Sequence, residues 1–263
     1  MMEALSPANI GLLLFGIFFV LLLIGSPIMV ALGVATMACF IVLDIDLSLM
    51  IERAFASLTA FPLMALPAFV LAGSLMEAAG VSRRLVHVAE NIVGPTPGGL
   101  AISTTLSCVF FGAISGSGPA TTAAVGMLMI PAMAKRGYNV GYAAAATATA
   151  GGIGIIIPPS ITFVIYGSVT GESVGELFAS GIVPGIIMGC FLIFAMMFTY
   201  RGRELKLLPK ASGRERWRAF VKAIPGLLMP VIILGGIYGG FFTPTEAAAV
   251  AAIYGIIVGF ITR

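Results

Sequence analysis

The chain has 263 residues, of which 59% are hydrophobic and 10% are charged, with a formal net charge of +3. Soluble domains carry about 25% charged residues, so this composition excludes a soluble enzyme, a nucleic-acid-binding protein and a disordered chain. The length accommodates roughly eight to ten membrane crossings. The sequence therefore predicts an all-α polytopic membrane protein, whose 33 glycines and 15 prolines indicate interrupted helices.

The first part of the chain contains a series of apolar runs. Glu3 is the one charged residue among residues 1–9, so the basic start of a cleavable signal peptide is missing. The runs 8–24, 28–43 and 54–76 predict membrane helices, and residues 1–80 are interpreted as scaffold helices.

An amphipathic stretch follows at 81–97, where an apolar stripe lies beside Arg83, Arg84 and His87. Such a helix lies in the plane of the membrane interface, either as a lateral arm of a moving part or as a surface anchor. We interpret His87 as an interfacial residue rather than a proton carrier.

The stretch 100–134 carries no charge, and basic pairs lie near both of its ends. It is longer than the about 20 residues of one spanning helix, so it predicts a re-entrant hairpin. Its tip, Gly112–Thr122, is rich in glycine, serine and threonine. A helix break there would offer carbonyl oxygens, N–H groups and hydroxyls to a monovalent cation beside an anionic substrate. Close packing of small residues is the alternative.

A second break is predicted within 141–170, at Gly151–Ser160, where three glycines precede Pro158 and Pro159. Proline removes a backbone donor and disfavours the α conformation of the residue before it. A structural kink is the alternative, and the run Ala143–Ala150 indicates tight packing. With the helix 178–200, these segments form a predicted transport domain over 98–200. The hydroxyls at and beyond the two breaks are candidate substrate-binding groups: Thr121, Thr122, Ser160 and Thr162.

The charges predict which side of the membrane each loop occupies. Residues 201–222 hold eight Lys or Arg and two Glu, which is typical of a cytoplasmic loop. The acidic loop with Glu172 and Glu176 is then periplasmic, and so is the N-terminus. Residues 201–224 form a second predicted amphipathic arm, which is basic and cytoplasmic.

An internal repeat is suggested by the resemblance of Ile24–Ala31 to Phe241–Ala248, since each places a hydroxyl residue and a proline in a turn between apolar helices. Residues 225–263 are interpreted as the first two helices of a second, inverted repeat, as found in secondary transporters, and a complete pair would need about 430 residues. Between Pro27 and Pro244 the chain is predicted to cross the membrane an odd number of times, through 28–43, 54–76, 141–170, 178–200 and 225–241, which would invert the second unit. We therefore expect a fragment or truncated form.

Glu77 and Glu246 lie near helix ends and are interpreted as capping or interfacial residues.

Four motifs in the same order resemble the large membrane (M) subunit of tripartite ATP-independent periplasmic (TRAP) transporters: Gly112–Thr122, Pro131–Tyr138, Gly151–Ser160 and Phe242–Ala247. The resemblance implies an elevator-type, sodium-coupled importer in the bacterial inner membrane. It also implies a small membrane (Q) subunit and a periplasmic binding protein that delivers an organic acid, such as a C4-dicarboxylate, sialic acid or another sugar acid. The residues that the resemblance places around the first sodium ion are Ser115, Ser117, Gly118, Pro119, Gly152, Gly154, Ile157 and Pro158. The family's second hairpin, second broken helix and second sodium site are absent here, so this chain alone is not expected to transport.

Other functions fit less well. A non-transporting assembly or scaffold subunit is the main alternative. An intramembrane enzyme would need a buried catalytic set that the sequence lacks, and no filter-forming sequence predicts a channel. Cys39, Cys108 and Cys190 are isolated, which predicts neither a transition-metal site nor a disulfide, and no organic cofactor is expected.

Overall fold

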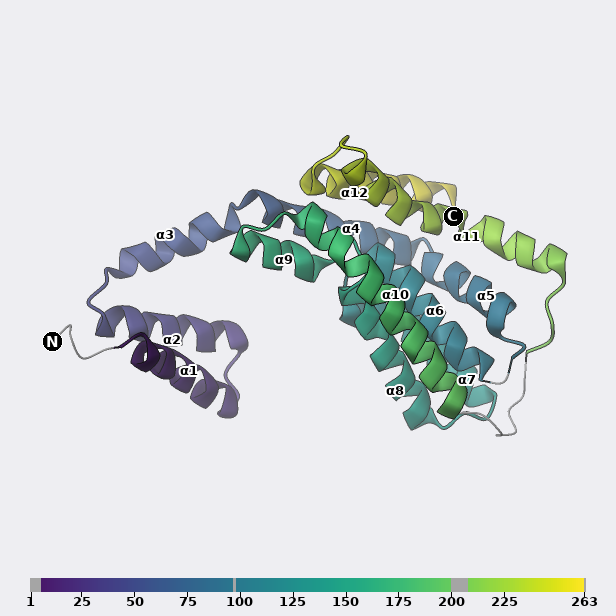
Figure 1. Cartoon of the computed structure of the whole chain (residues 1–263), viewed down its shortest axis with the longest axis horizontal. Helices are drawn as coiled ribbons and strands as arrows, with labels where there is room; N and C mark the ends of the chain where they lie inside the picture. The colour runs from purple at the N-terminus through teal and green to yellow at the C-terminus, as the bar shows by residue number, and fades with distance from the viewer. Residues whose placement is uncertain (1–5, 97, 200–207, 263) are drawn as a thin grey trace. The chain divides into compact units, whose positions relative to one another are not determined.

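The computed structural model describes residues 6–96, 98–199 and 208–262, which form helices and no strand (Figure 1). The chain divides into two units, Met1–Ala60 and Phe61–Arg263. The all-helical fold predicted from composition is confirmed. Residue 97, at the end of the predicted arm 81–97, lies outside the described residues, as do residues 200–207, where the predicted helix 178–200 ends and the predicted arm 201–224 begins.

The first unit contains α1 (Pro7–Leu23), α2 (Ile28–Val42) and α3 (Leu47–Leu58). α1 and α2 pack together across a turn in which Gly25 has φ +84°. α3 begins where the Asp46 carboxylate accepts a hydrogen bond of 2.8 Å from the Ser48 N–H. α1 and α2 have 17 and 15 residues, which lie at and just below the lower end of the about 17–25 residues of a spanning helix.

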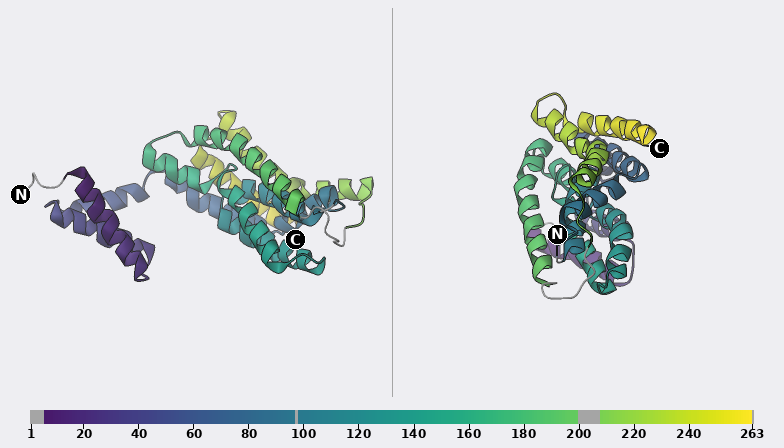
Figure 2. Two further views of the ribbon diagram at one scale, coloured as in Figure 1. Left: turned by 60° about the horizontal axis from the view of Figure 1, so that its bottom comes forward. Right: turned by 90° about the vertical axis from the view of Figure 1, so that its right-hand side faces the viewer.

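The second unit is built around the helical hairpin α6–α7, against which α5, α8 and α10 pack. Figure 1 shows α10 alongside α6, and the right view of Figure 2 shows α11 and α12 together on one side of the unit. α12 also packs along α4. The elements are η2 (Phe61–Met64), α4 (Ala65–Ala78), α5 (Val81–Val93), α6 (Gly99–Ser115), α7 (Gly118–Lys135), α8 (Val140–Gly151), η3 (Gly152–Ile155), α9 (Ile161–Thr170), α10 (Val174–Thr199), α11 (Gly213–Tyr238) and α12 (Pro244–Ile261).

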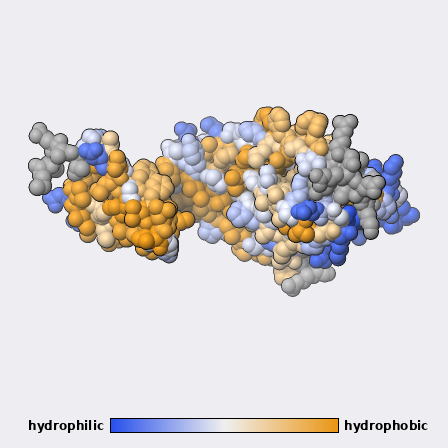
Figure 3. Space-filling view, turned by 90° about the horizontal axis from the view of Figure 1, so that it is seen from below, coloured by the Kyte–Doolittle hydropathy of each residue, from blue (hydrophilic) through white to orange (hydrophobic). Residues whose placement is uncertain are grey.

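Apolar side chains cover both the interior and much of the outside. Phe111, Phe178 and Met129 are fully buried in the second unit. Within the described residues, four stretches are long and apolar enough to cross a membrane: Phe61–Ala78, Val174–Thr199, Gly213–Tyr238 and Pro244–Ile261. Figure 3 shows hydrophobic residues over much of the visible face of each unit, with hydrophilic residues gathered toward the end where α11 begins. Exposed apolar surface of this extent is expected of a protein that faces lipid.

Two helix boundaries differ from those expected from the sequence. The predicted helix 54–76 is divided, because α3 ends at Leu58 and a short 3-10 turn containing Pro62 precedes α4. Proline restricts the residue before it, which favours a helix end there. By contrast, no boundary exists at 224–225: α11 continues from Gly213 through Pro225 and Pro230 to Tyr238. Membrane helices tolerate proline within them. The Tyr254 hydroxyl donates to Pro225 O at 2.8 Å, which ties α12 to α11 at this point.

The two turns of the suggested repeat differ in length and caps. Gly25 and Gly240 both take positive φ just after the preceding helix, but Gly240 lies outside the segment that resembles Ile24–Ala31. At the second turn Thr243 and Glu246 form a capping box, in which Glu246 Oε2 accepts from Thr243 N at 2.8 Å. The capping role predicted for Glu246 is therefore confirmed.

Candidate functional site

The hairpin tip is a turn of two residues between α6 and α7. α6 ends where Gly116 takes φ +62° and its N–H donates to Gly112 O at 2.8 Å. α7 begins with Ser117 as N-cap, whose Oγ accepts from Ala120 N at 3.4 Å, and Pro119 occupies the first turn, where no helical donor is needed. The predicted break of the hairpin is confirmed. Its re-entry into a membrane stays a prediction.

Hydroxyl groups converge just inside this turn. Ser115 Oγ lies 2.8 Å from Thr121 Oγ1 and 3.3 Å from Ser117 O, and Ser117 N donates to Ser115 Oγ at 3.3 Å. Ser115 and Thr121 are buried, whereas Ser117 is partly exposed. The tip therefore concentrates neutral oxygen atoms in a small, largely buried volume.

The second predicted break is also confirmed. α8 ends at Gly151, the short 3-10 helix η3 covers Gly152–Ile155, and α9 starts only after Ser160. Ser160 is buried, donates its hydroxyl hydrogen to Ile155 O at 2.6 Å, and accepts from Phe163 N at 3.4 Å. Pro158 and Pro159, which supply no N–H, occupy the unwound residues between the two helices.

The two breaks contact each other directly. Ile161 N, at the start of α9, donates to Gly116 O at the hairpin tip at 3.1 Å. A Cβ atom at Gly112 would lie 2.8 Å from Gly154 Cα, and one at Gly154 would lie 2.6 Å from Thr121 Oγ1. Glycine is required at Gly112 because the two backbones approach this closely, and a side chain at Gly154 would displace Thr121.

Some carbonyl groups that we expected to be free accept hydrogen bonds at the breaks. Gly116 O accepts from Ile161 N and so joins the two breaks, whereas Ile155 O accepts from Ser160 Oγ within the second break. A carbonyl oxygen has two lone pairs, so each of these groups retains the capacity to bind an ion.

The predicted site residues divide by location. Ser115, Ser117 and Thr121 lie together at the tip, and Gly118 faces η3, since its Cβ would lie 3.1 Å from Ile155 Cγ2. Thr122 packs against Gly151. The remaining predicted site residues lie in other surroundings.

Five predicted residues have surroundings less suited to a shared site. Ile157 packs on α10, since a Cβ at Gly185 would lie 2.6 Å from Ile157 Cγ1. Pro158 is buried, whereas Pro119 and Thr162 are exposed. Gly152 is partly exposed with open space beside it.

Sequence reasoning missed a carboxylate beside the tip. A cavity of about 100 Å³ between α4, α6 and α7 is lined by Glu77, Ser74, Ser115 and Ser117, with Val70, Gly73, Phe111, Ala120 and Ile161. Gly73 allows the close approach of α4, because its Cβ would lie 3.3 Å from Ser115 Cα. The spacing of Val70, Gly73, Ser74 and Glu77 is that of one helix face, which is the signal that could have linked Glu77 to the site.

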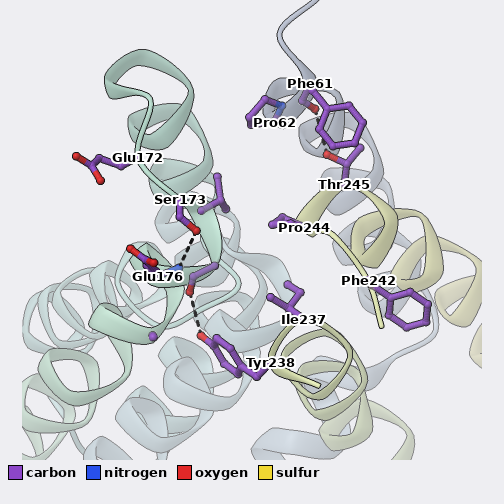
Figure 4. A pocket seen from close by; sticks show the side chains of 13 residues that line it. Phe61, Pro62, Glu172, Ser173, Glu176, Ile237, Tyr238, Phe242, Pro244 and Thr245 are labelled. Carbon is purple, nitrogen blue, oxygen red and sulfur yellow. Dashed lines mark hydrogen bonds between the residues drawn. The ribbon is translucent and has the colours of Figure 1, made fainter. Parts of the chain in front are cut away.

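A larger cavity, of about 660 Å³, lies away from the tip (Figure 4). Figure 4 shows Glu172 and Glu176 on one side and Pro244 and Thr245 across from them. Tyr238 Oη donates to Gly175 O at 3.4 Å, and Thr245 Oγ1 donates to Phe61 O at 3.1 Å. Two carboxylates and no basic side chain line this cavity, which makes it a poor site for an organic anion.

The sequence was compared with known protein families. The model of the family described as "Tripartite ATP-independent periplasmic transporter, DctM component" matches residues 15–263. The chain belongs to this DctM family. The resemblance found in the sequence is therefore confirmed, and the chain is a multi-pass membrane protein related to transporter permeases.

Curated relatives of this DctM-family chain carry names that differ in substrate. The C4-dicarboxylate TRAP transporter large permease protein DctM of Vibrio cholerae is 43% identical over 257 residues, covering 95% of this chain and 56% of the relative. The isethionate TRAP transporter permease protein DctMQ of Oleidesulfovibrio alaskensis is 46% identical over 257 residues, covering 94% and 39%. The 2,3-diketo-L-gulonate TRAP transporter large permease protein YiaN of Escherichia coli is 42% identical over 236 residues, covering 89% and 56%. The chain thus spans about half the length of such relatives or less.

Proposed function

We propose that this chain forms the sodium-binding half of the large permease of a TRAP transporter, which imports an organic acid by an elevator movement. The observation that carries the proposal is the direct contact between the two helix breaks, with buried hydroxyls of Ser115 and Thr121 between them. Neutral oxygen ligands and partial helix charges suit an alkali-metal ion beside an anionic group.

The proposal extends to partners and substrate class. The matching relatives named for C4-dicarboxylates, isethionate and 2,3-diketo-L-gulonate all carry organic acids in their names, and one of them is named DctMQ. We therefore propose a small Q-type membrane subunit and a periplasmic binding protein as partners, with the basic loop 201–222 in the cytoplasm and the N-terminus in the periplasm. An assembly subunit without transport activity is the competing function, favoured if the chain binds a partner and sodium has no effect on it.

The sodium site is tested by replacing Ser115 with alanine in the full-length permease with its partners. Hydrogen bonds and ligand contacts to a charged group contribute about 1.5–3 kcal/mol, so the sodium concentration for half-maximal uptake should rise about tenfold or more. The added replacement of Ser117 by alanine should raise it further. Sodium-dependent uptake in proteoliposomes gives the measurement.

Ser107→Ala is the matched control. Ser107 lies in the same helix, is also buried, and donates to Ser103 O at 2.7 Å, two turns from the tip. An unchanged sodium requirement in Ser115→Ala, or the same change in Ser107→Ala, would refute the assignment.

Glu77 is proposed to attract the ion to the cavity beside the tip. Replacing Glu77 with glutamine keeps its size and removes its charge, and should lower sodium affinity several-fold through the lost attraction across a partly buried cavity. The loss of sodium affinity in Glu77→Gln should be larger at low ionic strength, because other ions then screen the Glu77 charge less. Equal sodium affinities of the wild type and Glu77→Gln would leave Glu77 as an interfacial residue.

A further inference from the structure

A basic cavity separate from the hairpin tip lies between α5, α7 and α11. Its volume is about 420 Å³. It is lined by the charged or titratable side chains Arg83, Arg84, His87, Glu90 and Lys222, and by the apolar side chains Val86, Leu128 and Ala219. This combination of a cationic rim and an apolar lining has no role in the sodium site.

The cavity carries an excess of positive charge. Arg83, Arg84 and Lys222 are cations at neutral pH, and Glu90 is the one carboxylate among its lining residues. Burial raises the pKa of Glu90, while His87 and Arg136 act in the opposite direction. Arg84 also donates to Thr262 O at 3.3 Å, which fixes its guanidinium near the end of α12. The cavity therefore suits an anion with several acceptor oxygens.

The packing of α5 on α11 makes this cavity a built feature of the fold. Leu85 and Ala89 of α5 and Ala219 and Ala223 of α11 are buried where these helices meet. Gly226 allows this contact, because a side chain there would collide with Val81. Arg83 and Lys222 are thereby brought from distant parts of the sequence to the same cavity.

Aromatic side chains locate the level of the cavity in a membrane. Trp217 and Phe220 of α11 are 66% and 43% exposed, and their rings stack at 6.1 Å. Tryptophan is enriched at the boundary between hydrocarbon and head groups. Ala219 and Lys222, from the same two turns, therefore lie at head-group depth, on the face where the basic loops predict cytoplasm.

We propose that this cavity binds the phosphate of an anionic phospholipid, such as phosphatidylglycerol or cardiolipin. Guanidinium groups match phosphate oxygens in pairs, and basic pockets between membrane helices on the cytoplasmic side are suited to such head groups. Val86, Leu128 and Ala219 would contact the first carbons of the lipid. The inference depends on the cytoplasmic orientation of α5 and α11, and is independent of sodium coupling.

The test measures lipid binding to the purified full chain in detergent by native mass spectrometry, with phosphatidylglycerol, phosphatidylcholine and inorganic phosphate as separate probes. The variant Arg83→Gln/Lys222→Gln should lose about thirtyfold in phosphatidylglycerol affinity, since each basic residue near an anionic membrane surface contributes about a fivefold factor. The variant Arg83→Lys/Lys222→Arg keeps both charges and should retain most of the phosphatidylglycerol binding. That retained binding would show that substitutions at these two positions leave the cavity folded.

Arg214→Gln/Arg218→Gln is the matched control, because it removes two charges from exposed positions of α11 outside the cavity. It should change the affinity less than twofold. Equal losses in both charge-removing variants would overturn the proposal in favour of diffuse surface attraction. Equal affinity for phosphatidylcholine, or tight binding of inorganic phosphate alone, would overturn the choice of an anionic lipid.

Discussion

Replacing Gly116 with alanine is expected to destabilise the protein more than the same replacement at Gly171. Both glycines end a helix with positive φ, +62° and +78°, so alanine costs each position about 1–2 kcal/mol of backbone strain. A Cβ at Gly116 would also lie 2.6 Å from Pro159 O, whereas a Cβ at Gly171 would meet nothing within 4 Å. Overpacking against backbone adds about 1–3 kcal/mol at Gly116 alone.

The difference between these variants isolates the contact between the hairpin tip and the second break. Thermal unfolding of both variants in one detergent, in the absence of sodium, gives the comparison. If Gly116→Ala and Gly171→Ala lower the unfolding temperature equally, the hairpin tip is not in close contact with Pro159. The proposal that the two helix breaks form one site would then be wrong.

Local chemistry explains which parts of the site were predictable. The turn at Gly116–Ser117 and the interruption before Ser160 follow from glycine, proline and hydroxyl caps, which act within a few residues of themselves. The order of such residues also carried the family resemblance. These features depend on neighbours in the sequence, so the sequence alone predicted them.

Contacts between distant segments were not predictable in the same way. Nothing near Gly112 in the sequence indicates that it meets Gly154, and Glu77 gains significance only because Gly73 lets α4 approach Ser115. Likewise, the shift from polar to apolar residues near 224 predicted a boundary that α11 does not have. Helix continuity there depends on the packing of α11 on α5 and α12, which periodicity does not reveal.

The joined breaks also change how the proposed sodium site should be understood. The sequence suggested that the breaks leave carbonyl oxygens free, whereas in the structure Gly116 O accepts from Ile161 N of the second break and Ile155 O accepts from Ser160 Oγ within that break. An ion between such groups would strengthen a contact that already exists, because each oxygen keeps a lone pair. Sodium should therefore stabilise the folded protein measurably, by mass action on the native state.

Replacing Gly154 with alanine should weaken both this contact and the response to sodium. Its Cβ would lie 2.6 Å from Thr121 Oγ1 and 3.1 Å from Ser117 O, so it would push Thr121 away from Ser115 at a cost of about 1–3 kcal/mol. Gly235→Ala is the control, since Gly235 lies inside α11, away from both breaks, and a Cβ there would meet nothing within 4 Å. Unfolding temperatures of the full-length permease with sodium and with choline should show the sodium-dependent increase in Gly235→Ala but a reduced one in Gly154→Ala. A full sodium response in Gly154→Ala would mean that the ion does not depend on the alignment of these two breaks.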